Sequence, residues 1–429
     1  MYPRLGSVRT VREAAGVTTT ATKHRYTIIS ADGHCGANVE GYKPYLERKY
    51  HDQFDAWAAA FVNPYSDLAS DTAYRSWDSD RRQEELESDG VAAEVLFPNT
   101  VPPFFPSGNL LAPLPLADEY ELRWAGVKAH NRWLADFCAA VPGRRAGIAQ
   151  IFLNDIDDAL AEIRWTKEAG LTGGVLIPGI GPGCGLRPLF AKEYEPIWAL
   201  CEELDLTVNQ HGGTGLPLDF DPLQPEDRAV LLVEIPIFGH RGMYHLMFGG
   251  VFERHPSLRF VLTEQGTGWI PGALRSLDWF QRRMRIETAA EHQFGGEVAA
   301  KMSLTPTEYF ARNCWVGASF IRPVEAELRH EIGVDRIMWG SDYPHSEGSY
   351  PYTTEALRAS LADATEDEMR LMLGRTAADV YGFDFDALQT VADRIGPTVD
   401  EVAVPLPVPE WPTDTTCNAF DADAIVRSW

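Results

Sequence analysis

The stretch Ile28-Ile29-Ser30-Ala31-Asp32-Gly33-His34 determines how the rest of the chain is interpreted. It starts as a buried strand would and ends on an acid and an imidazole two positions apart. Residues i and i+2 of a strand point to the same side, so Asp32 and His34 can share one cation. A solvated aspartate beside a half-buried histidine accounts for so short a motif equally well. Whether this is a metal site therefore depends on the remaining sequence.

Eight short apolar segments recur along the chain, and all but the last are followed by a connection long enough for a helix. They are mostly continuous runs, which is typical of parallel strands covered on both faces. The segments lie near residues 26–31, 92–97, 146–152, 173–178, 206–210, 258–264, 313–317 and 336–341. Helices are predicted over residues 80–88, 118–137, 155–168, 192–204 and 270–285. This order predicts an α/β fold, a (β/α)8 TIM barrel with its chemistry at the carboxyl ends of the strands.

Those predicted strand ends are rich in side chains that bind metals or polar substrates. Singly, each has a structural explanation: Asn99 suits a turn, and Gln150 can satisfy backbone groups. Together at one mouth of a barrel they predict a single site. The residues are Asp32, His34, Asn99, Gln150, Gln210, His211, Glu264, Gln265, Asp342 and His345.

Aromatic residues near the same strand ends are candidates for the wall of a substrate pocket. Ordinary barrel packing explains each of them too, because aromatic side chains dominate buried cores. With Asn99, the predicted pocket residues are Phe104, Phe105, Trp269 and Tyr343, and further candidates are Phe97, Trp315 and Phe320.

Four motifs in chain order resemble the amidohydrolase-related family, in particular its branch of aminocarboxymuconate semialdehyde and γ-resorcylate decarboxylases. They are Asp32-x-His34, Asn209-Gln210-His211-Gly212-Gly213, Phe252 to Phe260, and Trp339-Gly340-Ser341-Asp342-Tyr343-Pro344-His345. The resemblance implies a barrel that binds a divalent metal through Asp32, His34, His211 and Asp342. Such a nitrogen and oxygen shell suits zinc, manganese or iron.

The chain departs from the decarboxylase pattern after the sixth predicted strand. Members of that branch carry a histidine there, which can act as a general acid, whereas this chain has Thr263-Glu264-Gln265-Gly266. Glu264 and His345 complete a set of three carboxylates and three imidazoles, enough for two cations bridged by a carboxylate. We expect all six side chains to bind metal, and Glu264, Asp342 and His345 to be catalytic.

Glu264, the opening around Asp32 and the Gly-x-Gly-Trp sequence at 266–269 also resemble the TIM-barrel nonheme diiron monooxygenases of the platensimycin and platencin diterpenoid hydroxylase type. This resemblance implies two Fe ions, an external electron donor and hydroxylation of a bulky, terpenoid-like acyl substrate, which could be a coenzyme A thioester. The oxygenase is the leading hypothesis. The alternative is a metal-dependent hydrolase or nonoxidative decarboxylase of a small carboxylic acid, with one Zn or Mn. A barrel that only binds ligands would be expected to lack some ligand positions.

The composition narrows the binding partners and the cellular compartment that are expected. The 429 residues carry a formal net charge of −24, which disfavours nonspecific binding to nucleic acid or anionic membranes. The six cysteines show no Cys-x-x-Cys spacing and fit reduced thiols. No apolar signal core or membrane span is apparent, so a cytoplasmic enzyme is expected.

The predicted organisation is one barrel with three additions. A flexible arm covers residues 1–25, the barrel covers 26–385 with an insertion or lid at 36–79, and an extension covers 386–429. The proline-rich tail from residue 397 is expected to be extended rather than helical. Its aromatic residues would dock on the body or on a second subunit, and a homo-oligomer is expected.

Overall fold

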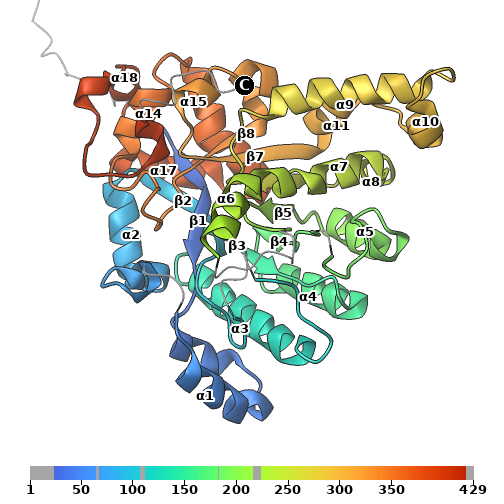
Figure 1. Ribbon diagram of the computed structural model, residues 1–429. Helices are drawn as coiled ribbons and strands as arrows, with labels where there is room; N and C mark the ends of the chain where they lie inside the picture. The colour runs from blue at the N-terminus through green and yellow to red at the C-terminus, as the bar shows by residue number, and fades with distance from the viewer. Residues whose placement is uncertain (1–23, 64–66, 107–111, 182, 216–223, 422–429) are drawn as a thin grey trace, which may run out of the picture.

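Eight parallel strands form one sheet in sequence order, from β1 to β8 (Figure 1). The computed structural model describes residues 24–63, 67–106, 112–181, 183–215 and 224–421. All eight predicted strand positions and the TIM-barrel fold are confirmed. The strands are β1 (Ile28–Cys35), β2 (Val91–Pro98), β3 (Arg145–Gln150), β4 (Gly174–Leu176), β5 (Val208–His211), β6 (Phe260–Thr263), β7 (Cys314–Ser319) and β8 (Ile337–Gly340).

The barrel closes through contacts between β1 and the segment that follows β8. Gly33 pairs in parallel with Tyr343, and the N–H of Asp342 donates to the carbonyl of Asp32 at 2.9 Å. The hydroxyl of Ser30 donates to the same carbonyl at 2.7 Å, where the register between β1 and β2 shifts. These bonds bring two acid-bearing segments together that are 310 positions apart in the sequence.

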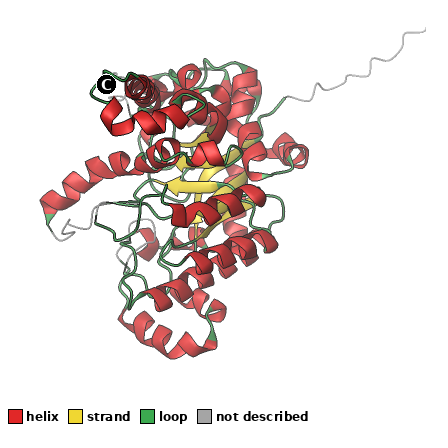
Figure 2. Ribbon diagram, turned by 90° about the vertical axis from the view of Figure 1, so that its right-hand side faces the viewer, coloured by secondary structure: helices red, strands yellow, loops and turns green. Residues whose placement is uncertain are grey.

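Helices surround the strands (Figure 2). The five predicted helices are confirmed to within a few residues, and Asp155 caps α4 through the N–H of Asp158. The helices are α1 (His51–Ala60), α2 (Ser79–Ser88), α3 (Tyr120–Ala139), α4 (Ile156–Glu168), α5 (Glu195–Glu203), α6 (Pro225–Gly239), α7 (Arg241–Phe248), α8 (Val251–Arg254), α9 (Ile270–Arg285), α10 (His292–Lys301), α11 (Pro306–Asn313), α12 (Pro323–Ala326), α13 (Arg329–Ile332), α14 (Thr353–Ser360), α15 (Glu366–Arg370), α16 (Thr376–Tyr381), α17 (Phe385–Ile395) and α18 (Val399–Val402). In the described ranges, no helix is long and apolar enough to cross a membrane.

The insertion after β1 packs against the loop that follows β2. It contains α1 and short 3-10 turns, and the rings of Phe54 and Trp57 lie 6.4 Å and 5.9 Å from the ring of Phe104. The hydroxyl of Tyr42 also lies 2.7 Å from that of Thr100. The insertion therefore braces one loop of the barrel mouth. Its role as a lid remains a prediction.

The tail differs from the expectation that it is extended. Residues 399–402 form α18, which Thr398 begins with a capping box, and 3-10 turns follow at 408–410 and 418–420. The expectation failed because four residues with a capping threonine can form a helical turn between proline segments. Trp411 is buried and donates its indole N–H to Leu406 O, so this aromatic residue docks on its own chain. The predicted arm falls mainly on residues 1–23, outside the described ranges.

Candidate metal centre

Six of the predicted side chains meet at the carboxyl ends of β1, β5, β6 and β8. They form two overlapping groups, in each of which four ligand atoms lie within 4.8 Å of one another. Both groups include His34 and Glu264. The first adds Asp32 and His211, and the second adds Asp342 and His345.

His34 lies at the centre of this cluster. Its Nε2 atom is 3.2 Å from Asp32 Oδ1 and 3.2 Å from Asp342 Oδ1. His211 Nε2 lies 3.5 Å from Asp32 Oδ1 and 3.1 Å from Glu264 Oε2. Negatively charged oxygens and imidazole nitrogens therefore converge on one small volume, as in a mixed shell for a divalent metal.

Four polar atoms of this cluster are buried without a hydrogen-bond partner. They are Asp32 Oδ1, His34 Nε2, His211 Nε2 and Asp342 Oδ2. Leaving a buried polar atom unpaired costs about 1–3 kcal/mol, so four in one place require a compensating partner. A divalent cation would satisfy all four, and the residues present therefore fit such an ion.

Hydrogen bonds at the far side of each ring orient the two histidines. His34 Nδ1 faces the carbonyl of Pro98 at 3.3 Å, and His211 Nδ1 faces the carbonyl of Gly212 at 3.0 Å. Because a carbonyl only accepts, Nδ1 carries a proton, and Nε2 is the ring atom that points into the cluster and would bind a cation. This is the usual arrangement of metal-binding histidines.

His345 is held differently from the other two imidazoles. Its Nδ1 lies 2.9 Å from Asp342 Oδ1 and its Nε2 lies 3.1 Å from Asn99 Oδ1. Asn99 donates its amide to the hydroxyl of Ser76 at 3.0 Å, which leaves its oxygen to accept from His345. Both ring nitrogens are therefore engaged in hydrogen bonds, and His345 as a ligand of the second group remains a prediction.

Burial and the clustered charges shift the protonation equilibria of these groups. Burial alone would lower the pKa of His211, but Glu264 and Asp32 raise it to about 10. Asp32 and Asp342 likewise outweigh burial and raise the pKa of His34. Burial and the charge of Asp342 raise the pKa of Glu264, so this carboxyl holds a proton more readily than an ordinary one.

Glu264 and Asp342 share an uncommon backbone conformation. Their φ angles are +52° and +58°, in the left-handed region that residues with a Cβ seldom adopt. Such strain concentrates at functional sites. The Glu264 side chain is 28% exposed, whereas those of Asp32, His34 and Asp342 are fully buried. Among these acids, Glu264 is therefore the one that faces the mouth of the barrel.

Two of the aromatic candidates have rings that contact a histidine, and the others pack elsewhere. Phe97 packs under the cluster, with its ring 4.7 Å from that of His211, and Trp269 stacks on His240 at 3.4 Å. In contrast, Tyr343 donates its hydroxyl to Glu85 of α2 at 2.6 Å, which draws it away from the cluster. Of the others, Phe105 is buried against Phe152, Phe104 packs on the insertion, Phe320 packs near α14 and the tail, and Trp315 lies under Arg336.

Ser319 is a site residue that the sequence reasoning missed. It ends β7 and donates its hydroxyl to Asp32 Oδ2, which leaves Oδ1 for a cation. The rule that a barrel's chemistry lies at strand ends could have identified it, because it lies two residues after the strand predicted at 313–317.

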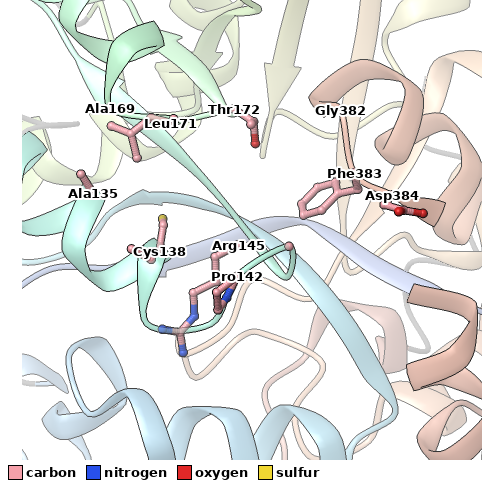
Figure 3. Close-up of a pocket in the computed structure, with 13 residues that line it drawn as sticks. Ala135, Cys138, Pro142, Arg145, Ala169, Leu171, Thr172, Gly382, Phe383 and Asp384 are labelled. Atoms are coloured by element: carbon pink, nitrogen blue, oxygen red, sulfur yellow. The ribbon is translucent and has the colours of Figure 1, made fainter. Parts of the chain in front are cut away.

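A separate cavity of about 330 Å³ lies at the opposite end of the barrel (Figure 3). It is lined by Arg145 at the start of β3, by residues 169–172 before β4, and by the turn at 382–384. Because these are the amino ends of the strands, this cavity is distinct from the candidate metal centre.

Comparison with known proteins agrees with this geometry. The amidohydrolase family model matches residues 55–383, so the chain belongs to the amidohydrolase family and is an enzyme of that family. A γ-resorcylate decarboxylase of Rhodococcus jostii (strain RHA1) is 31% identical over 268 residues, which cover 59% of this chain and 75% of that protein.

Two solved structures show the same fold at lower identity. The 5-carboxyvanillate decarboxylase of Sphingomonas paucimobilis has a TM-score of 0.61 at 20% identity, covering 83% of this chain and 99% of its own. A dihydroxybenzoic acid decarboxylase of Polaromonas sp. JS666, solved with manganese and the inhibitor 2-nitroresorcinol, has a TM-score of 0.58 at 20% identity, covering 83% and 97%. These similarities to decarboxylases support the alternative hypothesis, which included a nonoxidative decarboxylase. None of these relatives supports the diiron monooxygenase.

Proposed function

We propose that this protein is a metal-dependent nonoxidative decarboxylase of a hydroxylated aromatic carboxylic acid. The observation that carries the proposal is the set of four unpaired buried atoms on Asp32, His34, His211 and Asp342. These are the four ligand positions that the resemblance implies. The similarity to γ-resorcylate decarboxylase supports the substrate class.

One divalent ion, such as manganese or zinc, would bind at these four residues and hold the carboxylate or an adjacent phenolic oxygen of the substrate. The bond between the ring carbon and the carboxyl group breaks, carbon dioxide leaves, and the electron pair remains on the ring. A proton must then reach that carbon. Glu264 is placed to deliver it, because among the acids of the cluster its side chain is the one exposed at the mouth.

A second candidate function rests on a specific feature of the cluster. The two ligand groups share His34 and Glu264, so a carboxylate could bridge two ions, as in the oxygenase hypothesis. Two irons, an electron donor and an acyl-coenzyme A substrate would all be required. The decarboxylase needs none of these and agrees with the relatives.

The deciding experiment measures metal content and reaction together. We expect about one manganese or zinc per chain by elemental analysis, and release of carbon dioxide from 2,6-dihydroxybenzoate or 5-carboxyvanillate without oxygen uptake. Two irons per chain with substrate-dependent oxygen uptake would refute the proposal and favour the oxygenase.

Metal binding is expected to release protons. In the metal-free protein the raised pKa values of His34 and His211 keep both rings protonated at pH 7, and a cation must displace those protons. Apparent affinity should therefore rise as the pH increases from 6 toward 10. Calorimetric titration of manganese in buffers of different ionisation enthalpy should show release of roughly two protons. Heat that does not depend on the buffer would contradict this protonation scheme.

The anchoring of His345 by Asn99 gives a further expected result. Asn99→Ala should lower kcat about 10- to 100-fold and leave metal content unchanged, because Asn99 positions an outer partner and does not bind the ion. The matched control is Asn154→Ala. Asn154 follows β3 and donates its side-chain amide to the carbonyl of Pro115. An unchanged kcat in Asn99→Ala would show that His345 needs no such support.

A further inference from the structure

The carboxyl end of β2 holds two histidines of the candidate metal centre. The carbonyl of Pro98 faces His34 Nδ1 at 3.3 Å, and Asn99 Oδ1 lies 3.1 Å from His345 Nε2. Because the two contacts come from neighbouring residues, a shift of this short segment would displace both imidazoles at once. We call residues 98–100 the β2 tripeptide. The orientation of the two rings therefore depends on what fixes the β2 tripeptide.

The insertion after β1 fixes the third residue of the β2 tripeptide. The hydroxyl of Tyr42 lies 2.7 Å from Thr100 Oγ1, and the same hydroxyl lies 2.9 Å from Nδ1 of His130 on α3. Tyr42 and His130 are fully buried, and Thr100 is nearly so. Hydrogen bonds are stronger in such surroundings than in water. A buried chain of three polar groups therefore ties the β2 tripeptide to the insertion and to α3.

The direction of these hydrogen bonds follows from the buried imidazole. Burial lowers the pKa of His130 to about 3, so the ring is neutral at pH 7 and carries one proton. In the part of the chain that the structure describes, His130 Nε2 has no hydrogen-bond partner. Orphaned N–H groups are rarer in protein interiors than unused acceptors, so the proton lies on Nδ1 and is donated to the oxygen of Tyr42. Tyr42 is therefore the donor in the bond to Thr100.

The backbone leaves room for this bond because residue 36, directly after β1, is glycine. A Cβ at Gly36 would lie 2.8 Å from the hydroxyl oxygen of Tyr42 and closer still to Thr100 Oγ1. The N–H of Gly36 donates to the carbonyl of Ser76 at 3.0 Å, and the hydroxyl of Ser76 accepts from the side chain of Asn99. Two parts of the insertion therefore meet at the β2 tripeptide and hold its second and third residues.

We propose that Tyr42 is a positioning residue of the metal centre: it holds the β2 tripeptide through Thr100 and so orients His34 toward the cation. The inference rests on the proposed function, because it requires a cation bound at His34. Loss of an outer partner of a metal ligand costs about 10- to 100-fold in metal affinity or activity. Tyr42 acts through a backbone segment, so its loss should weaken metal binding by the lower end of that range and not abolish it.

The first test measures manganese binding through the electron paramagnetic resonance signal of the free ion. Tyr42→Phe removes only the hydroxyl and should raise the dissociation constant of manganese about 10-fold. The control is Tyr45→Phe, because Tyr45 lies on the same 3-10 turn and donates its hydroxyl to Asp136 of α3 at 2.9 Å. This control should bind manganese as the unmodified protein does. An unchanged dissociation constant in Tyr42→Phe, or an equal rise in both variants, would overturn the inference.

Substitutions of Thr100 test the path from Tyr42 and separate it from a general loss of stability. Thr100→Val removes the hydroxyl and keeps the shape, so it should weaken manganese binding about as much as Tyr42→Phe does. Thr100→Ser keeps the hydroxyl and should bind manganese nearly as the unmodified protein does. The double variant Tyr42→Phe, Thr100→Val should bind no more weakly than the weaker single variant, because both changes remove one hydrogen bond. Effects that multiply in the double variant would overturn the assignment to this bond.

The same titrations separate a failure of this inference from a failure of the proposed function. They use the metal alone, so their outcome does not depend on which reaction the enzyme catalyses. An unmodified protein that binds no manganese would overturn both the metal centre and the role of Tyr42. Manganese binding that is the same in the unmodified protein and in Tyr42→Phe would overturn only the role of Tyr42 and leave the proposed function standing.

Discussion

His211→Ala is expected to abolish metal-dependent decarboxylation while the barrel stays folded. His211 provides one of the four unpaired buried atoms and closes the cluster between Asp32 and Glu264. Loss of an outer partner of a metal ligand costs about 10- to 100-fold, so loss of the ligand itself should cost about 1,000-fold or more in kcat/KM. Elemental analysis of the purified variant should show well under half of the normal metal content.

The control variant for this experiment is His330→Ala. His330 lies on the surface, where it pairs with Glu368 far from the cluster, so the variant should keep full metal content and activity. The circular dichroism spectra of both variants should match that of the unmodified protein, and His330→Ala should also keep its unfolding temperature. Normal metal content in His211→Ala would show that the cation is held elsewhere.

The sequence predicted the strands and the ligand positions because each depends on local patterns. Continuous apolar runs identify buried parallel strands, and strand ends of a barrel must meet at one mouth. Asp32 and His34 follow from the two-residue repeat of a strand. That the pair lies beside Asp342 follows from closure of the barrel between β1 and β8, a consequence of the predicted fold.

Other features could not be predicted because they depend on side-chain directions set by distant contacts. Tyr343 adjoins a ligand in sequence, yet Glu85 on α2 draws its hydroxyl away from the pocket. His345 belongs to the second group of possible ligands, and its hydrogen bonds to Asn99 and Asp342 could not be read from its spacing. Residue types and spacing predict which residues lie at the site. The direction of each side chain depends on hydrogen bonds to residues that are distant in the sequence.

Glu264→Gln is expected to reduce kcat at least about 100-fold and to leave one metal per chain. If Glu264 carries the proton to the ring carbon, the amide cannot replace it, and loss of a general acid costs about 100- to 10,000-fold. The four proposed ligands, Asp32, His34, His211 and Asp342, keep their positions, so metal content should not change. Stopped-flow assays of carbon dioxide release and elemental analysis of the same preparation measure both quantities.

Glu264→Gln also distinguishes the decarboxylase from the two-ion oxygenase, because loss of a carboxylate that bridges two ions would change the metal content. Under the two-ion hypothesis, Glu264→Gln would lower the metal content from about two ions to one. Glu264→His adds a second comparison: it restores the imidazole that the decarboxylase branch carries after the sixth strand, so it should recover part of the activity that Glu264→Gln loses. Glu287→Gln, at an exposed acid between α9 and α10, controls for loss of one negative charge. Full activity in Glu264→Gln would exclude Glu264 as the proton donor and leave His345, the remaining imidazole at the mouth, as the group to test next.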